Sequence, residues 1–343
     1  MKRSTRITIK DLARQLKIST STVSRALRDH HEIKAETKKA VLELAKKLDY
    51  QPNEVSLSLL KKKTKMIGVV VPKMGYHFFS AALDGIEAVT QKAGFTVMVC
   101  QTNESYEREV QNIRNMAAGR VDGVLVSVSG ETKDYEHFRQ LQRKGIPLVF
   151  FDRECKSIEA SRVLVDNYGA SCKVVEHLAE MGCKKIAYLG GPQSMALSNT
   201  RLQGYKDTLE KLRLPIEGRW EVHCDVSRDG ARIAAEKLID QEDVPDAIFA
   251  MSDRLATTLM GLLKERGIKI PDEIAVVGFN NEPIAPIMTP SLTSVKQSEF
   301  EIGQLAAEIL LNEIDSEDEL EVPISRMIKT ELIIRESSKK IKS

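Results

Sequence analysis

The sequence predicts an α/β protein with a head of three short helices, a hinge helix and a larger body of two doubly wound parallel-sheet lobes. Two observations lead to this prediction. Apolar residues recur at helical spacing up to about residue 60, whereas strands and helices alternate from Met66 onwards. The charge changes at the same place: residues 1–65 contain 17 Lys and Arg against 7 Asp and Glu, and the remainder contains 34 against 42.

The first two helices are defined by their caps and by the spacing of their apolar residues. Thr8 can form a capping box with Asp11, and the apolar face that follows consists of Ile9, Leu12, Ala13 and Leu16. A tight turn at residues 17–19 leads to a second helix that begins at the hydroxyl cluster of residues 19–22. The second helix is expected to bury Val23, Ala26 and Leu27.

Two helices this short cannot bury their own apolar faces, and a third helix over residues 35–48 supplies the missing partner. Three small helices with a polar outer face on the second are typical of a helix-turn-helix DNA-binding domain. Short hydroxyl side chains let such a helix enter the major groove, and Arg25 could pair with guanine. The alternative, a three-helix bundle with a solvated polar surface, would not predict opposite charges in the two parts of the chain.

A hinge follows the third helix. Pro52 prevents that helix from continuing, and Asn53 can cap a new helix over residues 54–60. This segment is too short to be stable alone, and the basic residues 61–65 follow it. An apolar helix beside lysines needs an outside surface, which DNA or a second subunit can supply; an apolar side chain inserted into the minor groove would kink the duplex. A packed linker helix is the alternative.

The body begins with a continuous apolar run at residues 66–71, which is typical of a buried parallel strand. Further strands are predicted over residues 95–100, 123–128, 147–151, 185–189, 220–224, 247–250 and 274–279. The helices between them are predicted over residues 79–93, 107–118, 135–144, 168–181, 201–211, 230–239 and 254–266. This alternation predicts parallel sheets covered on both faces, in two halves that meet near residues 162–167. A strand at 293–295, a helix at 299–314 and a strand at 327–335 are left over.

Several classes of protein are disfavoured by what the sequence lacks. The first 20 residues contain no apolar run typical of a secretory signal, no stretch approaches a membrane span, and the five scattered cysteines show no C-x-x-C pair. We therefore expect a cytoplasmic protein with reduced thiols, no metal site, no cofactor and no membrane partner. Neither a dinucleotide-binding nor a P-loop motif occurs, and no catalytic set stands out among the six His, so an enzyme is not expected.

The first 65 residues resemble the DNA-binding head and hinge of the LacI/GalR (lactose-repressor) family. The matching segments are TIKDLARQLKISTSTVSRAL, AETKKAVLELAKKLDYQPN and the hinge before KTKMIGVVVP. The resemblance implies that Thr20, Ser21 and Arg25 read bases and that Leu59 enters the minor groove. The DNA-binding residues predicted in this way are Thr8, Thr20, Ser21, Thr22, Arg25, His31, Asn53 and Leu59.

The chain departs from the family pattern at several positions. Leu60 stands where the family often has a basic residue, and Asn280 stands where many members have an Asp. Ser56-Leu57 stands where the family usually has Ala-Arg, which makes this hinge more apolar. The body resembles the periplasmic-binding-protein-like core of the same family, which implies chain crossings between the lobes near Val165, Ser294 and Pro323. The expected boundaries are a head at 1–52, a hinge and linker at 53–65, and a body at 66–343, with one lobe at about 66–165 and 295–322 and the other at about 166–293 and 324–336.

Ligands of open parallel sheets bind beyond the carboxyl ends of the strands, and several such ends carry aromatic, acidic, amide or arginine side chains. This combination suits a polyhydroxylated ligand such as a sugar. The effector-binding residues predicted from these positions and from the resemblance are Phe78, Phe79, Asp152, Arg201, Asp253 and Asn280. Phe79 could instead belong to the core, and Asp253 could instead cap the following helix. Residues 193–200 lack the extra Arg of the purine-responsive relative, which weakens the alternative of a nucleobase effector.

These features together predict a homodimeric, ligand-responsive transcription regulator, most simply a repressor, whose two heads bind a palindromic double-stranded operator. A small molecule in the cleft between the lobes, expected to be a sugar, would change DNA binding through the hinges. Three alternatives remain open at this stage: a nucleobase or other metabolite as the effector, a DNA-binding protein without an effector, and a sugar-binding transport protein. The last of these would need a signal peptide and would not need the basic head.

Overall fold

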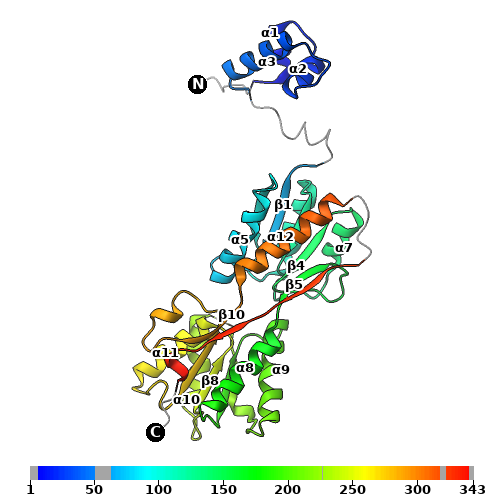
Figure 1. The fold of residues 1–343 in the computed structure, drawn as a ribbon. Helices are drawn as coiled ribbons and strands as arrows, with labels where there is room; N and C mark the ends of the chain where they lie inside the picture. The colour runs from blue at the N-terminus through cyan, green and yellow to red at the C-terminus, as the bar shows by residue number, and fades with distance from the viewer. Residues whose placement is uncertain (1–6, 51–62, 226, 317–321, 340–343) are drawn as a thin grey trace. The chain divides into compact units, whose positions relative to one another are not determined.

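The computed structural model describes residues 7–50, 63–225, 227–316 and 322–339, and the chain divides into two compact units, Met1–Thr64 and Lys65–Ser343. The first unit contains α1 (Ile9–Leu16), α2 (Thr20–Leu27) and α3 (Ala35–Lys47), as Figure 1 shows. Its small core consists of Leu12, Ala13, Val23, Ala26, Val41 and Ala45. The predicted three-helix head is therefore confirmed, whereas the predicted hinge helix lies outside the described residues.

Local hydrogen bonds explain where the first two helices begin. The Asp11 carboxylate accepts hydrogen bonds from the amide of Thr8 at 3.0 Å and from its hydroxyl at 2.7 Å, as expected for a capping box. Lys17 ends α1 in the left-handed region with a φ of 53°. Ser19 then caps α2 by accepting the amide hydrogen of Thr22 at 3.0 Å. These caps fix the turn, so the second helix presents its polar face outwards.

The first lobe of the second unit is built on a parallel sheet with the strand order β11-β5-β4-β3-β1-β2. The strands are β1 (Met66–Val71), β2 (Thr96–Gln101), β3 (Gly123–Val126), β4 (Leu148–Phe151), β5 (Ser161–Val165) and β11 (Ser325–Ile328). Helices α5 (His77–Thr90) and α12 (Glu299–Asp315) share one buried apolar cluster with the sheet, and α6 (Tyr106–Ala118) and α7 (Glu136–Arg143) share another. The sheet is therefore covered by a helix pair on each face.

The second lobe repeats this plan with the strand order β12-β10-β9-β8-β6-β7. Its strands are β6 (Ile186–Gly190), β7 (Glu221–His223), β8 (Ala247–Ala250), β9 (Ala275–Phe279), β10 (Thr293–Lys296) and β12 (Glu331–Ile333). Its helices are α8 (Asn167–Glu180), α9 (Ala196–Lys211), α10 (Arg228–Ile239) and α11 (Asp253–Glu265), with short 3-10 turns at Gly218–Trp220, Ala285–Ile287 and Glu336–Ser338. Only β12 runs antiparallel to its neighbour among the described strands.

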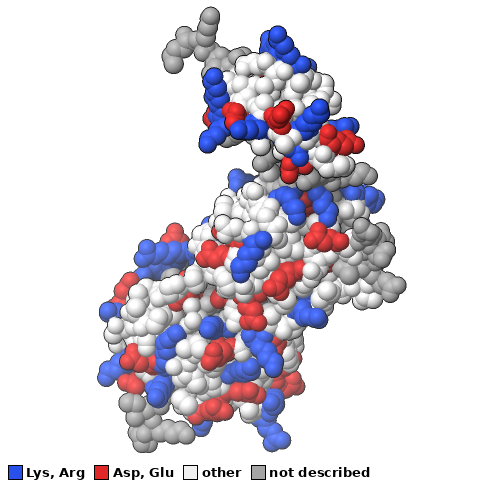
Figure 2. Space-filling model, turned by 45° about the horizontal axis from the view of Figure 1, so that its top comes forward, with Lys and Arg blue, Asp and Glu red and all other residues white. Residues whose placement is uncertain are grey.

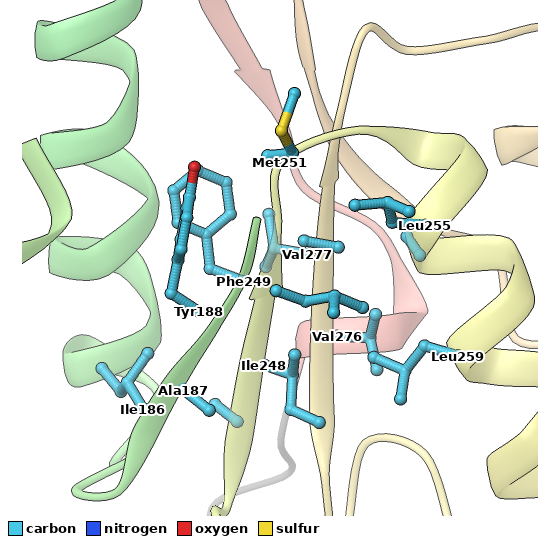
Figure 3. Packing of buried hydrophobic residues seen from close by; sticks show 14 of the residues in the cluster. Ile186, Ala187, Tyr188, Ile248, Phe249, Met251, Leu255, Leu259, Val276 and Val277 are labelled. Carbon is cyan, nitrogen blue, oxygen red and sulfur yellow. The ribbon is translucent and has the colours of Figure 1, made fainter. Parts of the chain in front are cut away.

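A dense apolar core fills the second lobe. Figure 3 shows Tyr188 and Phe249 side by side on neighbouring strands, with their ring centroids 5.4 Å apart in an edge-to-face arrangement. Val277 continues the same layer on β9, and each of these three side chains is fully buried. Because each lobe has a hydrophobic core of its own, the two lobes can be treated as separate rigid bodies that are joined by the chain crossings.

The predicted tail requires a correction. The single strand expected over residues 327–335 is two strands: β11 pairs with β5 in the first sheet, and β12 pairs with β10 in the second. The third crossing therefore lies between Ile328 and Glu331, not near Pro323. The second crossing follows the end of β10 at Lys296, close to the predicted position near Ser294. An extended run on two sheets has the same residue pattern as one long strand, which is why the pattern did not separate them.

A second correction concerns α9. The sequence predicted a loop up to residue 200 with Arg201 at the head of a helix, but α9 begins at Ala196. Met195 precedes the helix and is nearly buried, and Ser198 is fully buried with its hydroxyl donating to the Gly191 carbonyl at 3.3 Å. Arg201 consequently projects from the second turn of α9. Within the described residues, no helix has both the length and the apolarity needed to cross a bilayer.

Two glycines allow α5 and α12 to approach each other closely on the first lobe. A Cβ atom at Gly303 would lie 1.9 Å from the carbonyl oxygen of Ala82, and one at Gly85 would lie 2.1 Å from that of Phe300. Both neighbours are backbone atoms, which cannot rotate away as a side chain can. The packing of the helix pair that covers this sheet therefore depends on the absence of a side chain at these positions.

We expect Gly303→Ala to lower the free energy of unfolding by about 1–3 kcal/mol, because the helices must separate to admit a methyl group. Gly261→Ala is a matched control within α11, since a Cβ atom there meets no other atom within 4 Å. It should be neutral, or stabilising by about 0.5–1 kcal/mol. Urea denaturation of both variants measures the difference, and equal midpoints would contradict the proposed close packing.

Candidate functional site

The outer face of α2 carries most of the side chains that the sequence predicts to contact DNA. Thr20, Ser21 and Arg25 are exposed, whereas Val23 and Ala26 point into the head core. Thr22 is half-buried, and its hydroxyl lies 2.8 Å from that of Ser19. Short polar side chains on an exposed helix with a basic residue one turn later can enter a major groove and reach base edges.

The remaining predicted DNA contacts lie outside α2. Thr8 is exposed at the start of α1, and His31 is exposed after α2, where its ring stacks on that of His30 with centroids 4.5 Å apart. Asn53 and Leu59 lie outside the described residues. The face of the head visible in Figure 2 carries Lys and Arg side chains with acidic residues among them. The described head thus presents a basic surface with the α2 side chains available to solvent.

Arg25 is held by an acidic neighbour in the free head. Its guanidinium lies 3.0 Å from the carboxylate of Glu32, and both side chains are about half exposed, at 52% and 55%. An exposed ion pair of this kind contributes about 0–1 kcal/mol, so it can be exchanged for a stronger bidentate contact with guanine. Arg28, one turn further, donates to the hydroxyl of Ser24 at 2.9 Å.

The second candidate site is a cavity of about 300 Å³ between the two lobes of the second unit. Its walls come from the segments that follow the carboxyl ends of strands in both sheets, which is where open parallel sheets bind ligands. Its volume lies at the lower end of the range of small-molecule pockets, about 300–1,000 Å³. Five of the predicted effector contacts line it, namely Phe78, Phe79, Asp152, Arg201 and Asn280.

Arg201 is the most firmly placed of these residues. Its Nε donates to the Asn167 side-chain oxygen at 2.8 Å, and its Nη1 donates to the Met251 carbonyl at 2.5 Å. The guanidinium carbon lies 3.4 Å from the centroid of the Phe279 ring, so the cation is stacked on an aromatic face. Burial lowers the pKa of Arg201 to about 10, which leaves it charged at neutral pH. A fixed guanidinium at the cavity wall is a rigid hydrogen-bond donor.

Three cavity residues have left-handed backbone conformations. The φ angles are 65° at Glu104, 61° at Asp152 and 104° at Asn280. Such conformations are unfavourable for residues other than glycine and are concentrated at functional sites. Each of the three residues stands just beyond the carboxyl end of a strand, where the turn aims its side chain at the cavity. Burial raises the pKa of the Asp152 carboxyl, an effect that the nearby Arg153 and Arg201 oppose.

Phe78 and Phe79 line the cavity but expose little ring surface to it. Phe78 and Phe79 are 5% and 2% exposed, and their rings meet edge to face with centroids 5.2 Å apart. Both also belong to the apolar cluster under α5 and α12. Phe79 is therefore both a core residue, as the sequence had left open, and a residue of the cavity wall.

Asp253, which was predicted to contact the effector, is not among the residues that line the cavity. It is fully buried, and its oxygens accept the Ser294 hydroxyl at 2.6 Å and the Glu282 amide at 2.7 Å. Burial raises the pKa of Asp253 to about 7. Its position at the start of α11 ties that helix to β10 and to the segment after β9. The neighbouring Arg254 lines the cavity instead.

Two side-chain pairings at the cavity were not predicted from the sequence, although Tyr76 and Arg153 stand at strand ends that the rule for parallel sheets had indicated. Arg153 forms a bidentate ion pair with Glu104, with Nη1 and Nη2 2.7 and 3.1 Å from the two carboxylate oxygens. Arg254, from the second lobe, lies over the ring of Tyr76, from the first, at 4.7 Å. Glu104 follows the carboxyl end of β2, so the rule applied to the other strands would have found it. The contact between Tyr76 and Arg254 has no comparable signal, because it joins residues far apart in the chain.

Known protein families match both the head and the body of this chain. A model of the bacterial regulatory proteins of the lacI family matches residues 8–53, and a model of the periplasmic binding protein-like domain matches residues 175–338. The chain is 33% identical over 337 residues to the HTH-type transcriptional repressor PurR of Vibrio vulnificus, which covers 97% of this chain and 99% of the relative. It is 31% identical over 335 residues to the ribose operon repressor of Halalkalibacterium halodurans, which covers 97% of both chains.

Solved structures show the same fold. The transcriptional regulator CelR in its cellobiose complex is 27% identical and matches 97% of this chain and 100% of its own, with a TM-score of 0.73. The lac repressor dimer bound to operator and the anti-inducer ONPF is 23% identical, with a TM-score of 0.84 over 97% of this chain and 99% of its own, a likeness that concerns the fold alone. These relatives are regulators and not enzymes. The chain therefore belongs to the lacI family of DNA-binding transcriptional repressors.

Proposed function

We propose that this chain is a cytoplasmic, homodimeric repressor whose heads bind a palindromic operator and whose interlobe cavity binds a sugar or sugar derivative as effector. The observation that carries the proposal is the cavity itself, which lies between two lobes that share three chain crossings. A ligand that contacts both walls favours one relative arrangement of the lobes. It can therefore influence whatever the first lobe connects to, namely the hinge and the head.

The chemistry of the walls favours a hydroxyl-rich ligand. Carboxylates of Glu104, Asp152 and Glu282 offer acceptors, and Arg201 and Asn280 offer donors, all on the cavity walls. A sugar presents many O–H donors and acceptors on a compact ring, so it can use both kinds of group at once. The names of two relatives point the same way, since one is a ribose operon repressor and one was solved in complex with cellobiose.

A nucleobase is the second candidate, because the PurR repressors are 33% identical over almost the whole chain. A flat base would need an open aromatic face on which to stack. Phe78 and Phe79 are nearly buried and meet edge to face, so they offer little such surface. A thermal-shift screen of sugars and nucleobases on the full-length chain distinguishes the two, because at equal concentration the ligand that binds the folded chain more tightly raises the melting temperature further.

At the head, the proposed DNA contacts are Thr8, Thr20, Ser21, Thr22, Arg25 and His31, with Asn53 and Leu59 in the hinge. A dimer places two copies of α2 about one helical turn apart, and its twofold symmetry requires a palindromic site. The effector changes the affinity of the heads for the operator although it binds at a different site. If it weakens DNA binding, DNA must weaken effector binding by the same factor, and the reverse holds for a corepressor.

Arg25→Ala should reduce specific over non-specific DNA binding by about 1–3 kcal/mol, because a bidentate contact with guanine is lost. Arg14→Ala removes the same charge from α1 and serves as the control, since Arg14 is exposed and pairs locally with Asp11. Fluorescence anisotropy with a selected operator and a scrambled duplex gives both affinities. An unchanged ratio for Arg25→Ala would exclude a base-reading role.

Arg201→Ala should abolish the response of DNA binding to the effector and leave operator affinity without effector nearly unchanged, because the residue lies in the cavity wall far along the chain from the head. Lys211→Ala, an exposed change at the end of the same helix, should respond normally. Operator binding with and without the effector found in the screen measures both variants. Parallel loss of operator binding and of folding in Arg201→Ala would show a structural role instead.

A further inference from the structure

The cavity walls contain three arginines, and each of them already has partners within the protein. Arg201 uses its Nε and Nη1 hydrogens on Asn167 and on the Met251 carbonyl. Arg254 lies over the Tyr76 ring, and its charge also acts on Glu282. Arg153 is paired with Glu104 through both of its terminal nitrogens. At Arg153, an incoming anion would therefore have to displace Glu104 to gain a full ion pair.

The surroundings of Glu104 have the form of an occupied anion site. Its carboxylate accepts both Nη hydrogens of Arg153, and its Oε2 also accepts the amide hydrogen of Gly130 at 2.8 Å. A guanidinium fork beside a backbone N–H is an arrangement that binds phosphate or carboxylate groups. Arg153 is largely buried, with its side chain 12% exposed, and a buried cation needs a counterion. Glu104 is the counterion hydrogen-bonded to both terminal nitrogens, and Asp152 places a second carboxylate oxygen 3.6 Å from the Nε atom of Arg153.

The rest of the cavity adds negative charge. Glu131, Asp152, Asp225 and Glu282 also line it. Burial raises the pKa of the Asp152 and Glu282 carboxyls, so their charged forms are already destabilised. A phosphate group placed among them would meet like charges at short range in a partly dehydrated site, where such repulsion is strong.

We propose that this cavity selects an uncharged, hydroxyl-rich effector over its phosphorylated or carboxylated forms, and that Glu104 determines this specificity by occupying the anion site on Arg153 and Gly130. The inference rests on the proposed function of the cavity as the effector site. It narrows the ligand class to neutral polyols such as free sugars. It also assigns to the ion pair of Glu104 and Arg153 a role in rejecting ligands as well as in shaping the wall.

The test measures binding of inorganic phosphate to the full-length chain by isothermal titration calorimetry. Glu104→Gln keeps an acceptor for the Gly130 amide and removes the negative charge from the two terminal nitrogens of Arg153, leaving Asp152 beside the Nε atom. Phosphate affinity should therefore rise on the order of tenfold relative to the unmodified chain, as expected when a charge-assisted fork becomes available. Glu104→Ala, which also opens space beside the guanidinium, is a second variant whose affinity should rise in the same way.

Two controls make the result specific. Glu131→Gln removes one negative charge from the same cavity, and Glu131 has no ion-pair partner among the described residues. Phosphate affinity should rise much less in this variant than in the Glu104 variants, because the loss of Glu131 weakens the general repulsion but does not vacate the site on Arg153. The double variant Glu104→Gln with Arg153→Gln should return the affinity to that of the unmodified chain. Phosphate bound by the basic head contributes equally to all variants, so only differences between them count.

Three outcomes would overturn the proposal: tight phosphate binding by the unmodified chain, no gain in either Glu104 variant, or an equal gain in Glu131→Gln. Thermal melting of each variant establishes that it is folded before it is titrated. The readout is phosphate and not the effector. A chain without any sugar response could therefore still pass this test, and a failed phosphate test would leave the repressor proposal untouched.

Discussion

The three chain crossings between the lobes are the constraint on which the rest of the second unit depends. Each lobe has its own sheet and its own buried core, and the chain passes between them after β5, after β10 and after β11. Well-packed cores transmit movement as rigid bodies and do not absorb it. Any change in the relation of the lobes is therefore confined to the crossing segments and to the cavity walls. Residues of both lobes line the cavity, so such a change alters the distances across it.

The cavity walls combine rigidity with charge that is balanced within the protein. Arg201 is fixed by hydrogen bonds to α8 and to the segment after β8, and by stacking on β9, so its position reports the geometry of the whole second lobe. Arg153 and Glu104 perform a similar role in the first lobe. Tyr76 and Arg254 meet across the gap. A ligand that enters between these groups can thus bias the lobes through differential contacts, which is the physical requirement for allosteric control.

The fold could be predicted largely from the sequence because its two main signals are local. Helical spacing and capping residues gave the three head helices, and apolar runs of strand length gave the alternating body. The split of the tail into β11 and β12 could not be predicted in this way, since extended residues look alike whichever sheet they join. The early start of α9 was missed because Gly-Gly-Pro and the polar residues Ser198, Asn199 and Thr200 precede Arg201 and resemble a loop, yet Ser198 is fully buried within the helix.

The site was predicted less completely than the fold. The rule that ligands bind beyond strand ends, together with the family resemblance, selected five residues that line the cavity, namely Phe78, Phe79, Asp152, Arg201 and Asn280. It also selected Asp253, whose carboxylate is turned inward by the Ser294 hydroxyl and the Glu282 amide. Contacts between distant segments, such as Glu104 with Arg153, depend on how β2 and β4 lie in the sheet, and no local pattern encodes them.

The most direct test of the account is a linkage measurement on the full-length chain with its operator and its effector. The operator dissociation constant is measured with and without saturating effector, and the effector dissociation constant is measured with and without saturating operator. We predict that saturating effector changes the operator dissociation constant, and thermodynamic linkage then requires the operator to change the effector dissociation constant by the same factor. A ligand that occupies the cavity and leaves operator affinity unchanged would contradict the central claim that the cavity controls the head.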